Sequence, residues 1–178
     1  MATNQSITDG IPTARNVDHF GYNVPNLDEA LEFFVEVLGA EEAFRWGPMA
    51  DPDGDSMAAM LGVHPRTSVG GALLRLGPAS NVELLEYDAP DEASEPPKTA
   101  DPGASQLAFR VGDVEAATEY LREQQGVTVL DEPGEVPDDR SRRISLSSLA
   151  SVPCKQHSCP IRSLLSRQSS DGCCLGRS

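Results

Sequence analysis

Two stretches of this chain, HFGYNVPNLDEALEFFVEVLG (19–39) and QLAFRVGDVEAATEYLREQQG (106–126), align without a gap at one constant offset. Similar residue types coincide along the alignment, for example Asp28 with Glu115. Such internal self-similarity is typical of a repeated supersecondary unit. We therefore expect two copies of one module within the 178 residues.

Each copy has the pattern of a strand, a turn and a helix. In the first, apolar residues alternate over 20–24, which predicts a strand, and recur at helical spacing over 27–38. Asn26 is expected to cap this helix, and Asp113 has the same position in the second copy. Further strands are predicted in the first copy, at residues 43–46, 68–76 and 81–87. The first module is therefore strand–helix–strand–strand–strand.

The last 39 residues differ from the rest in charge and composition. Residues 1–139 carry 7 Lys and Arg against 27 Asp and Glu, whereas residues 140–178 carry 7 against a single Asp. All four cysteines and 11 serines also fall in this tail. We interpret the tail as foreign to the preceding domain, through a frameshift, a retained intron or an out-of-frame join, with a natural basic, Ser-rich tail as the alternative. We expect it to be disordered or weakly helical, which leaves the second module truncated.

The expected organisation has five segments. They are an N-terminal extension (1–14), the first βαβββ module (15–90), an acidic Pro-rich linker (91–104), a partial second module (105–139) and the basic Ser- and Cys-rich tail (140–178).

The composition also excludes some classes of function. A net charge of −14 argues against nucleic acid and against an anionic membrane surface as partners. The sequence contains no apolar run long enough for a transmembrane helix, and MATNQSITDGIPTARN (1–16) lacks the features of a secretory signal. We expect a cytoplasmic protein with a small molecule as its partner.

Strand alternation predicts which side chains face away from the helices. If the helices pack on the apolar side chains, then His19, Gln106 and Arg110 face the opposite side of their strands. The same rule places Glu83 on that side of the strand over 81–87. A curved sheet would gather these four side chains on its concave face.

These features resemble the vicinal oxygen chelate superfamily, which contains glyoxalases, bleomycin-resistance proteins and extradiol dioxygenases. The resemblance rests on the repeated module, with VDHFGYNV (17–24) and VELLEYDAP (82–90) at the ends of the first copy and SQLAFRVGDVEAA (105–117) opening the second. It covers about residues 15–137 and implies an α+β fold of paired βαβββ modules. It also implies a cup that binds a divalent metal through the first and last strand of each module.

Carried over by position, the resemblance implies His19, Glu83 and Gln106 as metal ligands, with Glu83 also the catalytic proton carrier. Imidazole, carboxylate and amide oxygen suit Zn, Ni, Mn or Fe(II). The repeat assigns the fourth ligand to Ser170, so the predicted site is incomplete. The alternatives are a satisfied polar strand residue for His19, a solvated carboxylate for Glu83 and a structural role for Gln106. Arg110 is expected to bind an anionic substrate group or to form a surface ion pair.

The resemblance implies two functions. The first is a metal-dependent glyoxalase- or dioxygenase-like lyase, isomerase or oxygenase for a small molecule with vicinal oxygens, which truncation would inactivate. The alternative is a non-catalytic, small-molecule-binding module of the bleomycin-resistance type. A truncated module would also expose a sheet edge, so we expect module pairing between two chains in a homodimer.

Three other features predict no site. DPDGD (51–55) begins like a calcium loop, but Ser56 and Gly62 replace the Gly and Glu of that pattern, so a turn is expected. His64 is expected in a surface loop. The tail residues that resemble zinc ligands lack a regular CxxC spacing: Cys154, His157, Cys159, Cys173 and Cys174.

Overall fold

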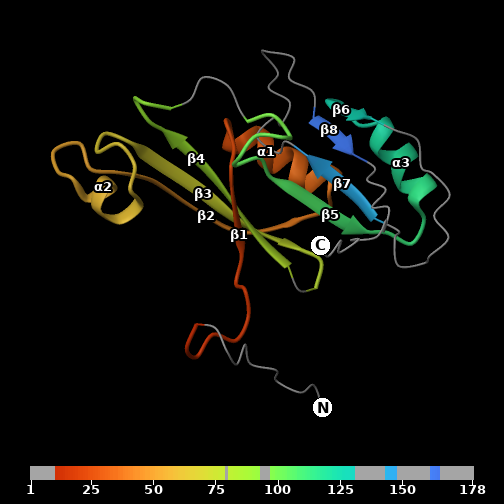
Figure 1. Ribbon diagram of the computed structural model, residues 1–178, viewed down its shortest axis with the longest axis horizontal. Helices are drawn as coiled ribbons and strands as arrows, with labels where there is room; N and C mark the ends of the chain where they lie inside the picture. The colour runs from red at the N-terminus through yellow and green to blue at the C-terminus, as the bar shows by residue number, and fades with distance from the viewer. Residues whose placement is uncertain (1–10, 79, 93–96, 131–142, 148–160, 165–178) are drawn as a thin grey trace, which may run out of the picture. The chain divides into compact units, whose positions relative to one another are not determined.

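The computed structural model describes residues 11–78, 80–92, 97–130, 143–147 and 161–164. The chain divides into two compact units, Met1–Glu95 and Pro96–Ser178. Each unit contains one four-stranded sheet (Figure 1). The fold is therefore α+β, as the sequence predicts.

The first unit is the predicted strand–helix–three-strand module with one short added helix. Its elements are β1 (Phe20–Asn23), α1 (Leu27–Glu32), η1 (Phe33–Val37), β2 (Glu41–Ala50), α2 (Ser56–Leu61), β3 (Ser68–Leu76) and β4 (Ser80–Asp88). The sheet order is β1-β4-β3-β2, in which β1 runs parallel to β4 and the other neighbours are antiparallel. Strand β2 is longer than the predicted 43–46, because irregularities in its pairing with β3 interrupt the simple alternation.

Helix α1 begins at the predicted cap and then changes its winding. The Asn26 side chain accepts a hydrogen bond from the Glu29 backbone N–H at 2.9 Å. In η1 the chain forms a π-helical turn, in which the Leu38 N–H donates to the Phe33 carbonyl at 3.2 Å. Both Phe33 and Phe34 are buried there, whereas the helical stripe in the sequence predicts only Phe34 as an inward residue.

The core of the first unit lies between α1 and one face of the sheet (Figure 1). Alternate residues of β3 and β4 form the sheet side of this core, and each is no more than 2% exposed: Ala72, Leu74, Val82 and Leu84. Phe20 is one of the alternating apolar residues over 20–24 that are predicted to pack against the helix. It is instead 60% exposed at the start of a four-residue edge strand. Residues between the buried positions, including Glu83, face the side of the sheet away from α1.

The second unit repeats the first two elements and then departs from the first unit. It contains β5 (Gln106–Arg110), α3 (Val114–Arg122), β6 (Val127–Val129), β7 (Arg143–Ser147) and β8 (Ile161–Leu164). Asp113 caps α3 as predicted, because its side chain accepts from the Ala116 N–H at 2.9 Å. The sheet order is β5-β7-β8-β6, and its parallel pair is β6 with β8 rather than a pair that includes the first strand.

Strands β7 and β8 correct one prediction about the tail. Both lie within 140–178, so the expectation of a disordered or weakly helical segment is wrong at Arg143–Ser147 and Ile161–Leu164. The physical reason is a short alternation in RISLS, where Ile144 and Leu146 are no more than 2% exposed. These two residues stand opposite Phe109 and Leu107 of β5 in the sheet. The overall polarity of the tail hid this pattern. The truncation of the second module and the foreign origin of the tail remain predictions.

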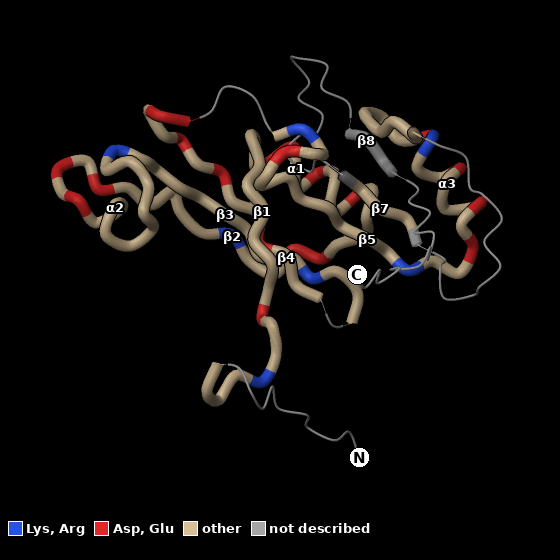
Figure 2. The backbone as a smooth tube through the Cα atoms, in the orientation of Figure 1, with Lys and Arg blue, Asp and Glu red and all other residues tan. Residues whose placement is uncertain are grey.

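Acidic residues outnumber basic ones in the first unit (Figure 2). Among the basic residues, Arg45 forms ion pairs with Asp28 at 2.7 Å and Glu42 at 2.9 Å. No helix within the described ranges has both the length and the apolar character that a membrane span requires.

Candidate functional site

The parallel register of β1 and β4 brings His19 next to Glu83. Gly21 stands opposite Glu83 in this pairing, and His19 precedes Gly21 by two residues, so both side chains lie on the face away from α1. The His19 Nε2 and Glu83 Oε2 atoms are 3.3 Å apart. The structure therefore places together two residues that the sequence proposes as metal ligands. Their role as ligands remains a prediction.

Asp18 fixes the other nitrogen of the His19 ring. The His19 Nδ1 lies 2.9 Å from Asp18 Oδ2, and the Asn81 side chain donates to the Asp18 carbonyl oxygen at 3.0 Å. The hydrogen bond that His19 donates to Asp18 is the largest influence on the His19 pKa and raises it above 6.5; desolvation opposes this increase, and the charge of Glu83 adds to it. The His19 side chain is 39% exposed, so a ligand can reach it from solvent.

This arrangement favours a cation at the His19–Glu83 pair. When Nδ1 donates to Asp18, the neutral ring presents the lone pair of Nε2 toward the Glu83 carboxylate. Two acceptors this close need a proton or a metal ion near them. A carboxylate on the far nitrogen of a histidine is also a common way to orient a metal-binding imidazole. The donor chemistry of the pair thus fits part of a divalent metal site.

Trp46 holds the second oxygen of Glu83 and was missed by the sequence analysis. Its indole Nε1–H donates to Glu83 Oε1 at 3.2 Å. Trp46 stands opposite Gly71 in the β2–β3 pairing. A Cβ atom at Gly71 would lie 2.7 Å from Trp46 Cζ2, so the missing side chain lets the indole rest directly on the strand. The available signal was that Trp46 is the single tryptophan of the chain.

Gln106 and Arg110 belong to the second unit, where β5 alternates as predicted. Gln106 and Arg110 are exposed, whereas the intervening Leu107 and Phe109 are half-buried. Both residues thus belong to a different unit from His19 and Glu83. Metal binding by Gln106 and anion binding by Arg110 remain predictions. Ser170 and the four cysteines lie outside the described residues.

A complete metal site is not visible in the part of the chain that the structure describes. Over those residues, no group of three or more His, Cys, Asp or Glu side chains is placed to hold a metal ion. The first unit contributes the imidazole of His19 and the carboxylate of Glu83. Any further ligands of a metal ion would have to come from other residues.

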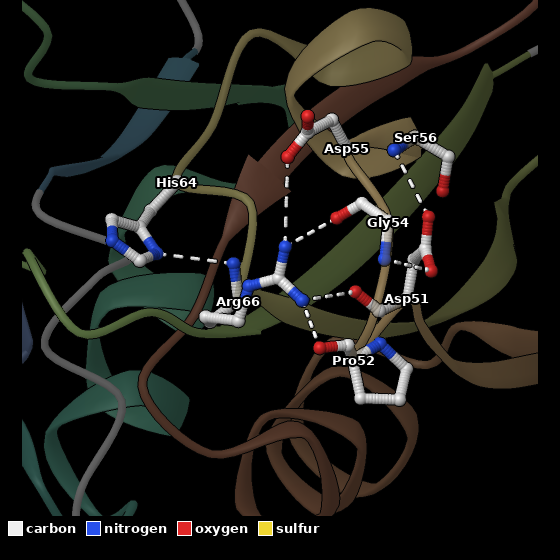
Figure 3. Close-up of polar contacts among 7 residues, drawn as sticks. All are labelled: Asp51, Pro52, Gly54, Asp55, Ser56, His64 and Arg66. Carbon is white, nitrogen blue, oxygen red and sulfur yellow. Dashed lines mark hydrogen bonds and ion pairs between the residues drawn. The ribbon is translucent and has the colours of Figure 1, made fainter.

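The segment over 51–55 is the predicted turn, and Arg66 holds it in place (Figure 3). The Asp51 carboxylate accepts from the backbone N–H groups of Gly54 at 2.9 Å and Ser56 at 3.0 Å. Hydrogen bonds from Ser56 lower the pKa of Asp51 from its ordinary value of 3.8. The bond from the Ser56 side chain has the largest effect and the bond from its backbone the next largest. The Arg66 guanidinium donates to the carbonyl oxygens of Asp51, Pro52 and Gly54. The carboxylate of Asp51 thus stabilises the turn.

Comparison with known proteins agrees with the architecture. A family model described as the glyoxalase/bleomycin resistance protein/dioxygenase superfamily matches residues 18–145. A 2-epi-5-epi-valiolone epimerase from an Actinomyces species is 48% identical over 129 residues, which are 72% of this chain and 69% of the relative. These matches confirm the resemblance that the repeated module indicates.

Proposed function

Because the chain belongs to the glyoxalase/bleomycin resistance protein/dioxygenase superfamily, we propose that it is an epimerase of a small ketone with an adjacent oxygen. Of the lyase, isomerase and oxygenase activities that the sequence left open, the relative's name supports the isomerase. The proposal makes 2-epi-5-epi-valiolone the first substrate to test.

The contact between His19 and Glu83 is the observation that carries this proposal. Epimerisation beside a carbonyl group removes a C–H proton, moves the electron pair toward the carbonyl oxygen, and returns a proton to the opposite face of the carbon. Glu83 suits the role of base, because Trp46 holds Oε1 while Oε2 faces His19. When protonated, His19 can donate from Nε2 to an oxygen that gains negative charge.

A divalent metal ion fits the same two residues. His19 and Glu83 would hold the ion, with Asp18 orienting the imidazole and Trp46 orienting the carboxylate. When bound, such an ion supplies Lewis-acid stabilisation of negative charge on a carbonyl oxygen. Gln106 is the predicted additional ligand.

Deuterium exchange provides the direct test. The protein is incubated with 2-epi-5-epi-valiolone in D2O, and NMR follows both the epimer formed and deuterium at the inverted carbon. We expect Glu83→Gln to reduce the exchange rate by about 100-fold or more, since a positioned base contributes at least that factor. Glu36→Gln, at an exposed position on η1, is the matched control. Absence of exchange in the wild-type protein, or an unchanged rate in Glu83→Gln, would reject the proposal.

A non-catalytic ligand-binding protein is the second candidate. It is supported by the family description, which includes bleomycin resistance proteins. Metal analysis separates the two functions. A stoichiometric metal that is lost in His19→Ala supports the enzyme, whereas a metal-free protein that binds the ketone and leaves it unchanged supports the binding role.

A further inference from the structure

We infer that a pocket at the end of β4 binds a neutral polyhydroxylated small molecule, at a site separate from the His19–Glu83 pair. The pocket has a volume of about 420 Å³, which is within the size range of small-molecule sites. Residues after α2 and residues at the end of β4 line it: Gly62, Val63, His64, Tyr87, Ala89, Asp91 and Glu92. The inference does not depend on the epimerase proposal, because the pocket shares no residue with the catalytic pair.

The pocket lies along the same face of β4 as Glu83. The pairing of β3 with β4 is unbroken from Ser80 to Asp88, so Glu83 and Tyr87 project to one side of the sheet. Four residues of strand separate them by roughly 13 Å. A small ring held against Tyr87 therefore does not also contact the Glu83 carboxylate, which makes this a distinct site.

His64 lines this pocket and carries a defined hydrogen-bond donor. Its Nδ1 accepts the backbone N–H of Arg66 at 3.0 Å, so the neutral ring carries its proton on Nε2. In Figure 3 this second ring nitrogen points away from the contacts around Arg66. Arg66 is itself anchored to the turn over 51–55, which fixes the loop that carries His64.

The combination of polar groups selects hydroxyl groups. His64 Nε2–H is a donor, the carboxylates of Asp91 and Glu92 are acceptors, and the Tyr87 hydroxyl can act as either. A hydroxyl group both donates and accepts, so it can satisfy all of them. Two carboxylates oppose the binding of an anion, and a simple ammonium group has no acceptor for the His64 proton.

NMR titration with myo-inositol tests the site without requiring any chemical reaction. We expect the imidazole signals of His64 to shift saturably, with inorganic phosphate producing no such shift. The chain has three histidines, and the His64 signals are assigned by their absence in His64→Asn. Binding is measured in parallel by calorimetry, and Tyr87→Phe is expected to weaken it about threefold to tenfold, the effect of one hydrogen bond.

His64→Asn separates recognition from folding. An Asn side-chain oxygen can accept the N–H of the residue two positions later, so this variant keeps the bond to Arg66 while it removes the distant ring donor. We expect an unchanged circular dichroism spectrum and about threefold to tenfold weaker myo-inositol binding. Glu36→Gln, at an exposed position on η1, should bind myo-inositol as the wild type does. No saturable shift up to the solubility limit, equal binding of phosphate, or unchanged affinity in both His64→Asn and Tyr87→Phe would overturn the inference.

Discussion

Gly71 is the position at which a single methyl group tests the architecture of the candidate site. We predict that Gly71→Ala destabilises the first unit and displaces the Trp46 indole. A Cβ atom at this position would lie 2.8 Å from the Leu84 carbonyl oxygen, in addition to its 2.7 Å approach to Trp46 Cζ2. Both distances are shorter than a normal van der Waals contact. The Leu84 carbonyl group belongs to the backbone of β4, which cannot move as freely as a side chain.

The magnitude follows from the cost of overpacking. An extra methyl group in a well-packed environment destabilises a protein by about 1–3 kcal/mol. The indole is the part that can move, and its movement breaks the hydrogen bond to Glu83. We therefore expect a loss of about 2 kcal/mol in the free energy of unfolding, together with a less ordered Glu83 carboxylate.

Gly70→Ala is the matched control, one residue earlier on β3. Its added Cβ would lie 3.5 Å from the Trp46 carbonyl oxygen and 3.9 Å from Pro48 Cα, which are ordinary contacts. We expect its stability to change by less than about 0.5 kcal/mol, as for substitutions that touch no special feature.

Urea unfolding followed by tryptophan fluorescence is the assay, because Trp46 is the chain's single tryptophan and reports on the first unit alone. Gly71→Ala should show a lower midpoint and a red-shifted native emission, while Gly70→Ala should match the wild type. If both variants unfold at the wild-type midpoint with unchanged emission, the indole does not rest on Gly71 and our account of how Glu83 is held is wrong.

Three further predictions concern the surroundings of the site and the second unit. Trp46→Phe should lower metal affinity or epimerase rate about 10-fold or more, since it removes the group that orients Glu83; unchanged values would contradict this. The His19 titration followed by NMR should have its midpoint above 6.5, and Asp18→Asn should lower it. Because folding raises the pKa of His19, the contact between His19 and Asp18 stabilises the fold fully below pH 6.5. This stabilisation is lost as the pH rises through the pKa of His19 in the folded protein. Urea unfolding midpoints measured across this pH range would show the loss. Asp113→Ala should destabilise the second unit by about 1 kcal/mol through loss of the α3 cap, seen by circular dichroism during urea unfolding; an unchanged midpoint would contradict the capping role.

Much of the first unit can be predicted from the sequence, because its signals are local. The alternation over 20–24 and the helical spacing over 27–38 require only neighbouring residues, and both elements form close to the expected bounds. The side of the sheet on which Glu83 lies follows from the same alternation. The π-helical turn at Phe33 does not follow from it, because one extra residue in a turn leaves the apolar pattern nearly unchanged.

The tail shows how an average can conceal a local pattern. Its basic, Ser-rich composition predicted disorder, yet Ile144 and Leu146 are buried in a strand opposite β5. Five residues are enough for a strand when an existing sheet offers its edge, because the partner strand supplies the hydrogen bonds and the apolar face.

Local patterns in the chain predict the repeated module, the family resemblance and the face of each strand on which His19 and Glu83 lie. The folded sheet is needed to show that these two side chains meet, that Asp18 and Trp46 hold them, and that Gly71 makes room for the indole. Alternation assigns a side chain to one face of its strand, whereas contact between side chains on neighbouring strands depends on register. Register is set by pairing between β1, β2, β3 and β4, including the irregularities in β2, and no single stretch of the chain contains that information.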